Sequence, residues 1–279
     1  MVARRELLIG AGALAGAATL VAQAREAAAQ STDGSTMDRV TSTKTLRISA
    51  IVGAEPYFKK NLGDGTWSGV GVEMAKSIAD PLGAKVEYVE TTYANSILDL
   101  KSGRIDLVFS LNPTAERALS IDFTHPYYLH PYCFLGKDFK ATTWADANKP
   151  TVRLCASNGT LPDALVKRYA PNAQVIVTKT IDEGVLAVQT GRADAIITAA
   201  LQALAIKVKN AQFQSITVPT GPRIALPTCL GVRVETSPRW TNYLNAWIDY
   251  NRASGQIMDW ITAELAKGGI RREDIPQDA

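Results

Sequence analysis

Short apolar runs alternate with amphipathic stretches from Thr45 to Ser110. The runs TLRISAIV, AKVEYVE and IDLVFS predict strands, because they are brief and rich in β-branched residues. Helices are predicted for VGVEMAKSIADPLG, which closes at Pro81 and Gly83, and for NSILDLKSG, which closes at Gly103. The order β-α-β-α-β favours a parallel sheet covered by helices.

The alternation restarts after Asp138, which predicts a second α/β unit of similar size. Its predicted strands are VRLCAS, AQVIVT and ADAIIT, the last of which leads into LQALAIKVK, and its predicted helices are LPDALVKRYA and IDEGVLAVQTG. The tail differs, since the strand TCLGVRV precedes two helices in WTNYLNAWIDYNRASGQIMDWITAEL, separated near Gly255. A strand followed by helices at this point is compatible with a return of the chain to the first unit.

The first residues have the composition of an export signal, predicted over 1–29, and a polar leader follows over 30–43. Arg4 and Arg5 precede a weakly hydrophobic Ala/Gly/Leu segment, which favours the twin-arginine route over an ordinary secretory signal. Small residues place cleavage after Ala24 or Ala29. Because this segment is too short to span a bilayer, we expect a mature periplasmic chain without a transmembrane segment.

Charge and composition exclude several classes of function. The 30 basic and 27 acidic residues are interspersed, so the net charge of +3 does not indicate nucleic-acid binding. The two histidines and three cysteines lack the spacing of a zinc site, so neither a metal nor a cofactor is expected. No Ser-His-Asp, Cys-His or paired-carboxylate set is apparent, which argues against an enzyme.

Several short motifs in combination carry a family resemblance. They are GVGVEMAK (69–76), LGAKV (82–86), LKSGRID (100–106), TAER (114–117), the turn DFTHPY (122–127) and GRADA (191–195). From Leu46 to about Leu265 the chain resembles the extracellular solute-binding proteins of polar amino-acid ABC transporters. The resemblance implies a monomer that binds a small solute and delivers it to an ABC permease.

The same resemblance implies an α/β fold of two lobes, the periplasmic-binding-protein fold, with the ligand in the cleft between them. Two crossover strands would join the lobes. Lobe 1 would comprise 44–132 and 230–279, and lobe 2 would comprise 133–229. Such proteins bind by hinge closure, in which a ligand that touches both lobes favours the closed state.

Arg117 and Thr160 are the leading candidates for binding a ligand carboxylate. A guanidinium donates two parallel hydrogen bonds to a carboxylate, and the resemblance places the clamp for the ligand's carboxylate at Arg117. The alternative for Arg117 is a surface ion pair. Thr160 follows Gly159 at a predicted helix start, where free N–H groups favour an anion; the alternative is a helix cap without a ligand.

Other candidates follow from the resemblance. Ser110 and Asn112 stand where small polar groups receive the ligand's amino group, and Tyr93 where an aromatic ring packs on the ligand. Trp67 and Tyr57 are weaker candidates of the same kind. Each aromatic residue has the alternative of simple core packing.

The chain departs from the family pattern where an aspartate normally pairs with the ligand's ammonium. Ala199 stands at that place, and Ile51-Val52-Gly53 replaces a second common aspartate. A buried ammonium without an anion is costly, so either the ligand is a carboxylate without an amine or another acid substitutes. Glu55 is the better substitute, because Glu73 lies in a predicted helix and is expected to face solvent.

Cys133 and Cys229 fall on the two crossover strands that the resemblance implies. If those strands are neighbours, a disulfide could join them, and two buried free thiols are the alternative. Cys155 lies inside an apolar strand and is expected in the core.

The leading hypothesis is therefore a solute-binding protein for a small carboxylate, either amino-acid-like or without an amine. Cyclohexadienyl dehydratases resemble this family, so an enzyme on the same scaffold is the alternative. Dehydration needs a general acid in the cleft, and Ala199 argues against one. A binding protein that serves a sensor or chemoreceptor shares the fold and stays open.

Overall fold

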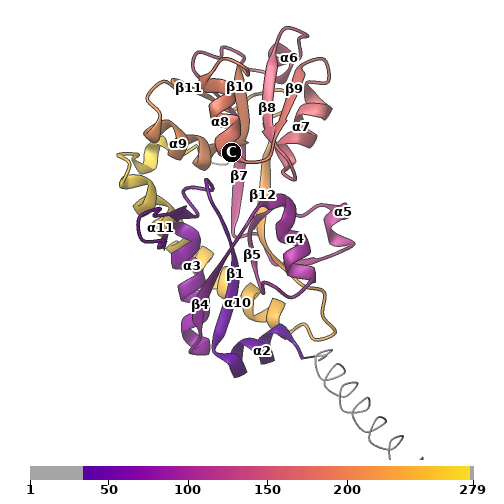
Figure 1. The fold of residues 1–279 in the computed structure, drawn as a ribbon, viewed down its shortest axis with the longest axis vertical. Helices are drawn as coiled ribbons and strands as arrows, with labels where there is room; N and C mark the ends of the chain where they lie inside the picture. Colours follow the sequence, from indigo (N-terminus) through magenta and orange to yellow (C-terminus); the bar gives the residue numbers. More distant parts are fainter. Residues whose placement is uncertain (1–33, 277–279) are drawn as a thin grey trace, which may run out of the picture.

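The computed structural model describes residues 34–276. The predicted export signal, its cleavage sites and the first part of the predicted leader lie outside these residues. Two lobes of helices and strands are joined by β7 (Tyr128–Gly136) and β12 (Ala225–Val232), which run side by side from one lobe to the other (Figure 1). This is the two-lobed α/β fold that the sequence predicts.

Lobe 1 is built on the predicted β-α-β-α-β unit. In it β1 (Thr45–Ile51) pairs in parallel with β4 (Lys85–Thr91), and Ile48 forms a parallel bridge to Leu107 just before β5 (Val108–Leu111). The intervening helices are α3 (Val70–Ala79), which runs into the 3₁₀ turn η1 (Asp80–Leu82), and α4 (Tyr93–Lys101). Both helices end close to the predicted glycines, and Gly83 and Gly103 take the positive φ that favours this residue.

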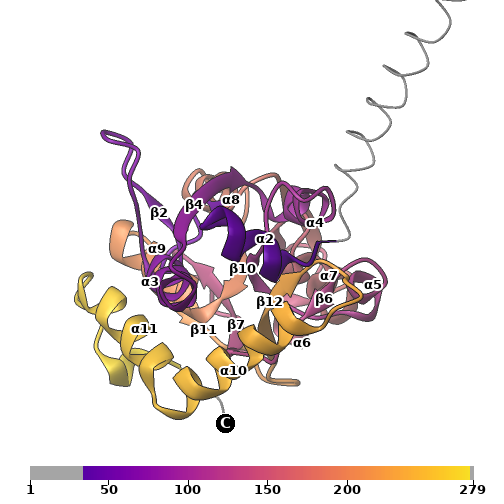
Figure 2. The same ribbon diagram turned by 90° about the horizontal axis from the view of Figure 1, so that it is seen from below.

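The tail returns to lobe 1, as the sequence permits. Helices α10 (Arg239–Ala253) and α11 (Gln256–Ala266) meet at Gly255, whose φ of +82° breaks the helical path. Trp240 and Ile261 belong to the same buried cluster as Leu46 of β1. Figure 2 shows the two helices curving along one side of the lobe, and a last 3₁₀ turn η2 (Arg272–Asp274) follows.

The predicted polar leader ends in a helix that is part of lobe 1. Helix α2 (Thr36–Thr43) begins at Ser35, whose side chain accepts a bond from the Asp38 N–H, and it buries Val40 completely. The Thr36 N–H donates to Glu235 at 2.9 Å, and Arg39 forms an ion pair with Asp106. The helix is therefore bound to lobe 1 mainly through polar groups.

Lobe 2 contains a parallel sheet with helices on both of its faces. The strand order is β7, β10 (Ala195–Ala199), β8 (Arg153–Ser157), β9 (Gln174–Thr178), and the last three strands run parallel. The main helices are α7 (Leu161–Tyr169), α8 (Ile181–Gln189) and α9 (Ala200–Lys209). The short elements of the two lobes are β2 (Lys59–Lys60), β3 (Trp67–Ser68), α5 (Ala115–Ala118), β6 (Asp122–Phe123), α6 (Trp144–Ala147) and β11 (Ser215–Thr217).

The crossover strands are neighbours, but they do not bring their cysteines together. The strands are antiparallel, with Ala225 opposite Pro131 and Thr228 opposite Tyr128. Continued along the strands, this register puts Cys133 opposite position 223 and Cys229 opposite position 127, so about 20 Å separates them. A disulfide requires Cα atoms within about 7 Å. Both cysteines are free and buried, so the predicted disulfide is wrong.

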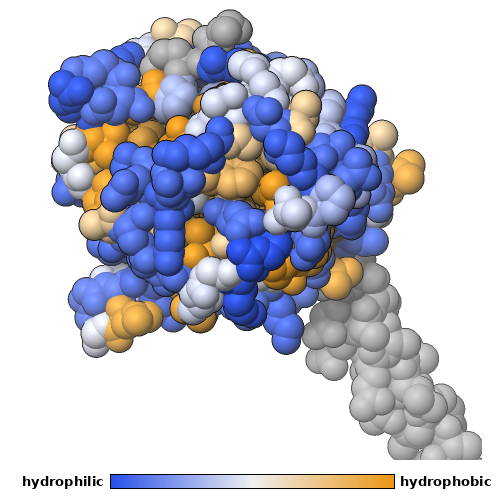
Figure 3. Space-filling model, turned by 90° about the horizontal axis from the view of Figure 1, so that it is seen from above, coloured by the Kyte–Doolittle hydropathy of each residue, from blue (hydrophilic) through white to orange (hydrophobic). Residues whose placement is uncertain are grey.

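One face of the molecule, at the α6 end, carries few extended apolar areas. The face at the α6 end is mostly hydrophilic, with apolar side chains in small scattered groups (Figure 3). Within residues 34–276, no helix has the length and apolar character needed to cross a membrane.

The predicted boundaries between the lobes, at 132/133 and 229/230, fall inside β7 and β12. The exact residue at which each lobe ends stays a prediction.

Candidate ligand-binding site

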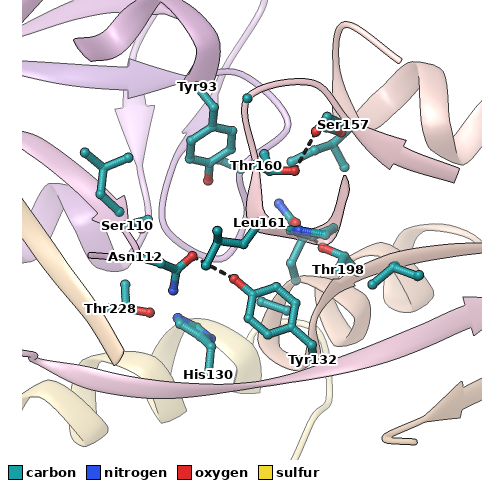
Figure 4. Close-up of a pocket in the computed structure, with 18 of the residues that line it drawn as sticks. Tyr93, Ser110, Asn112, His130, Tyr132, Ser157, Thr160, Leu161, Thr198 and Thr228 are labelled. Atoms are coloured by element: carbon teal, nitrogen blue, oxygen red, sulfur yellow. Dashed lines mark hydrogen bonds between the residues drawn. The ribbon is translucent and has the colours of Figure 1, made fainter. Parts of the chain in front are cut away.

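A cavity lies between the two lobes and is walled by both. Its volume, including the open mouth, is about 710 Å³. Lobe 1 supplies Tyr57, Tyr93, Ser110, Asn112 and Arg117, and the polar residues Ser157, Thr160, Thr198 and Gln202 come from lobe 2. In Figure 4, Tyr93, Ser110 and Asn112 lie across the cavity from Ser157, Thr160 and Thr198. His130 and Tyr132 of β7 and Thr228 of β12 lie below them in this view.

Arg117 reaches from lobe 1 to lobe 2. It lies in the short helix α5, and its guanidinium donates from Nη1 to the Asn112 carbonyl and from Nη2 to the Gly159 carbonyl, both at 2.8 Å. Among the ion pairs of residues 34–276 none includes Arg117. Burial lowers the pKa of Arg117, yet an arginine in a protein stays protonated. The cavity therefore contains a positive charge that forms no ion pair with a carboxylate of residues 34–276.

Asn112 fixes the position of that arginine. Its backbone carbonyl accepts a hydrogen bond from Arg117. Its side-chain Nδ2 donates to the Pro227 backbone carbonyl at 2.9 Å, and its side-chain Oδ1 accepts from the Tyr132 hydroxyl at 2.8 Å. The side chain is thus bonded to β12 and β7 within the protein. Asn112 lines the cavity as predicted, but these bonds explain it as a support for Arg117 without any ligand amine.

Ser110 and Tyr93 line the lobe 1 wall, where they were predicted. Ser110 has a φ of +60°, which is unusual for a residue with a side chain and is typical of functional sites. Its hydroxyl lies 3.1 Å from the hydroxyl of Tyr127. Tyr93 begins α4, and burial raises its pKa to about 12, so its phenol is neutral at physiological pH.

Thr160 stands at the start of α7, where it borders the cavity together with Leu161 and Pro162. Its hydroxyl donates back to the Ser157 carbonyl, and no side chain caps the helix. The alternative role of Thr160 as a simple side-chain cap therefore does not apply. The N-terminus of a nine-residue helix, which favours negative charge, lies at the wall opposite Arg117.

The acids suggested as partners for an ammonium are already engaged. Glu55 borders the cavity, and its carboxylate forms an ion pair with Lys209 of α9. Glu73 pairs with Lys76 on the exposed side of α3, as expected. Ala199, where the resemblance led us to expect an aspartate, lines the cavity at the end of β10 and supplies no carboxylate there.

Trp67 is not brought to the cavity. Its ring stacks on Tyr88 with a centroid distance of 6.4 Å, and the Lys60 ammonium lies 5.6 Å from the centre of the same ring. Tyr57 does line the cavity, and its hydroxyl lies 3.0 Å from His130 Nε2. Of these two weaker aromatic candidates, only Tyr57 is among the residues that line the cavity.

Three polar residues that sequence reasoning missed have buried atoms without a partner in this cavity. These atoms are His130 Nδ1, Ser157 Oγ and Thr228 Oγ1. Burial lowers the pKa of His130 to about 3, so its ring is neutral at physiological pH. The available signal was a polar residue inside a largely apolar strand, as in YLHPYCFLG and ALPTCLGV. Buried polar atoms usually have a partner, so these three indicate a ligand or ordered water.

Comparison with known proteins identifies the family of this chain. The family described as bacterial extracellular solute-binding proteins, family 3, matches residues 46–261. A probable histidine-binding protein of Campylobacter jejuni is 29% identical over 167 residues, which cover 60% of this chain and 64% of that protein. Cyclohexadienyl dehydratase of Pseudomonas aeruginosa is 26% identical over 176 residues, covering 61% and 64%. In both cases the match spans slightly less than two thirds of the relative.

Solved structures show the same two-lobed architecture. The crystal structure of an ancestral amino acid-binding protein, a precursor of cyclohexadienyl dehydratase, has a TM-score of 0.73 at 27% identity and covers 83% of this chain and 99% of that chain. An amino acid ABC transporter substrate-binding protein of Streptococcus pneumoniae, bound to L-arginine, has a TM-score of 0.76 at 20% identity and covers 86% and 100%. At this identity the second likeness concerns the fold alone.

Proposed function

Because the chain belongs to the bacterial extracellular solute-binding proteins, family 3, we propose that it captures a small carboxylate-bearing solute in the cavity between its lobes. Arg117 binds the carboxylate from lobe 1, and the N-terminus of α7 at Thr160 faces it from lobe 2. The solute is then delivered to an ABC permease from the periplasm. Curated relatives named as binding proteins of ABC transporters for amino acids support this role.

The observation that carries the proposal is the unneutralised charge of Arg117 inside the cavity. Two of its five N–H groups bond to carbonyls, and the others remain for a ligand. A buried cation is costly unless an anion pairs with it, so a ligand carboxylate would lower the free energy of the closed protein. The bidentate geometry of a guanidinium suits a carboxylate better than a neutral group.

Hinge closure is supported by contacts that join the two lobes around the cavity. Arg117 donates to Gly159, Gln202 donates to the Gly53 carbonyl at 3.4 Å, and Lys209 pairs with Glu55. A ligand held by both walls would add its own contacts to these and shift the population toward the closed state.

A binding role accounts for the cavity better than catalysis does. The likeness to cyclohexadienyl dehydratase keeps an enzyme as the alternative. Dehydration requires a positioned general acid, and the one carboxylate among the lining residues, Glu55, is paired with Lys209. The proposal is therefore a binding protein without turnover.

Arg117→Gln tests the carboxylate assignment. Calorimetric titration against a panel of small mono- and dicarboxylates should give binding to the wild type and at least a hundredfold weaker binding to the variant, because a charge-assisted pair is lost. Circular dichroism should show that the variant is folded. Arg168→Ala, which removes an arginine stacked on Tyr169 in lobe 2, is the matched control and should bind normally. Equal affinity of Arg117→Gln and wild type, or conversion of a bound acid seen by NMR, would contradict the proposal.

A further inference from the structure

We propose that the ligand also carries an uncharged hydrogen-bonding group, a hydroxyl, which binds between His130 Nδ1 and Thr228 Oγ1 on the crossover strands. This inference rests on the proposed function, since it takes the carboxylate to be held by Arg117. It narrows the solute to the class of hydroxycarboxylates.

Both atoms are deeply buried and lack a partner. His130 is 4% exposed and Thr228 is 1% exposed, and both side chains line the cavity. Neither His130 Nδ1 nor Thr228 Oγ1 has a hydrogen-bond partner among residues 34–276. An unsatisfied buried polar atom costs about 1–3 kcal/mol, so a ligand group that bonds to both atoms would recover part of this cost.

The register of the crossover strands places the two side chains together. Thr228 of β12 lies opposite Tyr128 of β7, and His130 is two residues further along β7. Residues two apart on a strand point to the same face, so His130 and Thr228 are diagonal neighbours on one face. Figure 4 shows both on the side of the cavity near Asn112, away from Ser157 and Thr160. One small ligand group can therefore contact both.

The electrostatics of the cavity exclude a charged group at this place. An ammonium would need a carboxylate, but Glu55, the one carboxylate among the lining residues, is paired with Lys209. A second carboxylate would need a cation, but Arg117 is the one cation among the lining residues and serves the first carboxylate. The buried imidazole of His130 is neutral. An uncharged polar group avoids the cost of burying an ammonium without an anion and that of burying a second carboxylate without a cation.

A ligand hydroxyl can bond to His130 Nδ1 and Thr228 Oγ1 in either neutral tautomer of the histidine. The Tyr57 hydroxyl lies 3.0 Å from His130 Nε2 and can donate to it or accept from it. His130 Nδ1 is correspondingly a donor or an acceptor. A ligand hydroxyl both donates and accepts, whereas a carbonyl only accepts. A hydroxyl also reproduces the bonds of a water molecule that would otherwise satisfy these atoms.

The test compares matched ligands on the wild type and one variant. Straight-chain monocarboxylates of three to six carbons are titrated in three forms, with hydrogen, hydroxyl or ammonium at the same carbon. On the wild type, the best hydroxyl form should bind about tenfold more tightly than its hydrogen and ammonium counterparts. In Thr228→Val, the preference for the hydroxyl form over the hydrogen form, given as the ratio of their affinities, should fall to about twofold.

Thr262→Val is the matched control, because Thr262 Oγ1 is also buried and unpartnered but lies in α11 outside the cavity. This variant should still bind the hydroxyl form about tenfold more tightly than the hydrogen form, as the wild type does. Equal binding of hydroxyl and hydrogen forms on the wild type overturns the inference, as does tighter binding of the ammonium form, or an unchanged ratio in Thr228→Val. If binding without hydroxyl preference still depends on Arg117, the inference alone fails. If no acid binds, or if Arg117→Gln binds them all normally, the proposed function fails with it.

Discussion

One strand of each lobe, β1 in lobe 1 and β8 in lobe 2, is joined to a later loop by the same local arrangement. In it an aspartate accepts hydrogen bonds from the backbone and the side chain of an arginine. In lobe 1, Asp106 accepts from the Arg47 N–H at 2.8 Å and from its guanidinium at 2.8 Å. In lobe 2, Asp194 accepts from the Arg153 N–H at 2.7 Å and pairs with its guanidinium. The aspartates end the similar tracts SGRID and TGRAD.

The two arrangements differ in what else they hold. Asp106 also pairs with Arg39 of α2, and its side chain is 2% exposed, whereas that of Asp194 is 29% exposed. The aspartate of lobe 1 thus joins three segments of the chain, and that of lobe 2 joins two. Similar tracts therefore need not contribute equally to stability, because the contribution depends on partners from elsewhere in the fold.

The largest expected effect is the loss of Asp106. Asp106→Ala leaves two arginines without their buried anion, and we expect the free energy of unfolding to fall by about 3 kcal/mol. Asp194→Ala should cost less than half as much, because that carboxylate is partly solvated. Urea unfolding followed by circular dichroism measures both, and Asp138→Ala at an exposed pair is the control. Equal losses at Asp106 and Asp194 would show that burial and the third segment add nothing.

The strands between the lobes should make stability depend on pH through His130. Burial lowers the pKa of His130 from 6.5 to about 3, so between these values the unfolded chain binds a proton that the folded protein does not. The contribution of neutral His130 is present above pH 6.5 and is lost as the pH falls toward 3. From pH 6.5 to 5 the ligand-free protein should lose about 2 kcal/mol from this residue.

His130→Gln should flatten that dependence in urea unfolding measured at several pH values. His125→Gln is the control, because the His125 ring is exposed and pairs with Asp249 at the surface of lobe 1. The assignment fails if the wild type and His130→Gln have parallel profiles between pH 6.5 and 5.

The smallest of the effects expected in this Discussion concerns closure of the lobes around the ligand and not the free energy of unfolding. Gly159 and Gly191 both have a φ of +73°, so alanine strains the backbone equally at each. A Cβ at Gly159 would lie 2.9 Å from the Ala94 Cα across the cleft, whereas a Cβ at Gly191 meets nothing within 4 Å. Gly159→Ala should therefore weaken ligand binding about tenfold, and Gly191→Ala should not. Calorimetry on the two variants decides this, and equal affinities would mean that the lobes do not close at Ala94.

The arrangement of strands and helices could be predicted from the sequence because hydrophobic period and glycine positions are local signals. Each main strand and helix of the two predicted units is present, and so are the two tail helices. Helix α2 was missed because its segment TMDRVTST buries only Thr36 and Val40, and its other contacts are ion pairs and hydrogen bonds to distant residues. Polar tertiary contacts of this kind leave no periodic trace in a sequence.

Most of the candidate site residues that the sequence motifs indicated do line the cavity. Arg117, Thr160, Ser110, Asn112, Tyr93 and Glu55 all line the cavity, while Trp67 packs elsewhere. His130 and Thr228 were missed because their meeting depends on the pairing of strands almost one hundred residues apart. The error over Cys133 and Cys229 has the same origin, since the resemblance implied two crossover strands but neither their pairing nor their register.

The path of the chain through the two lobes sets the order in which the residues of their cores are synthesised. The buried clusters of lobe 2 come from one continuous stretch, from Tyr132 to Ile224. The main cluster of lobe 1 combines Leu46 and Ile48 with Trp240 and Ile261 from the other end of the chain. A chain that grows from its N-terminus therefore has all of lobe 2 before lobe 1 is complete. The lobe that begins first is the last to acquire its core.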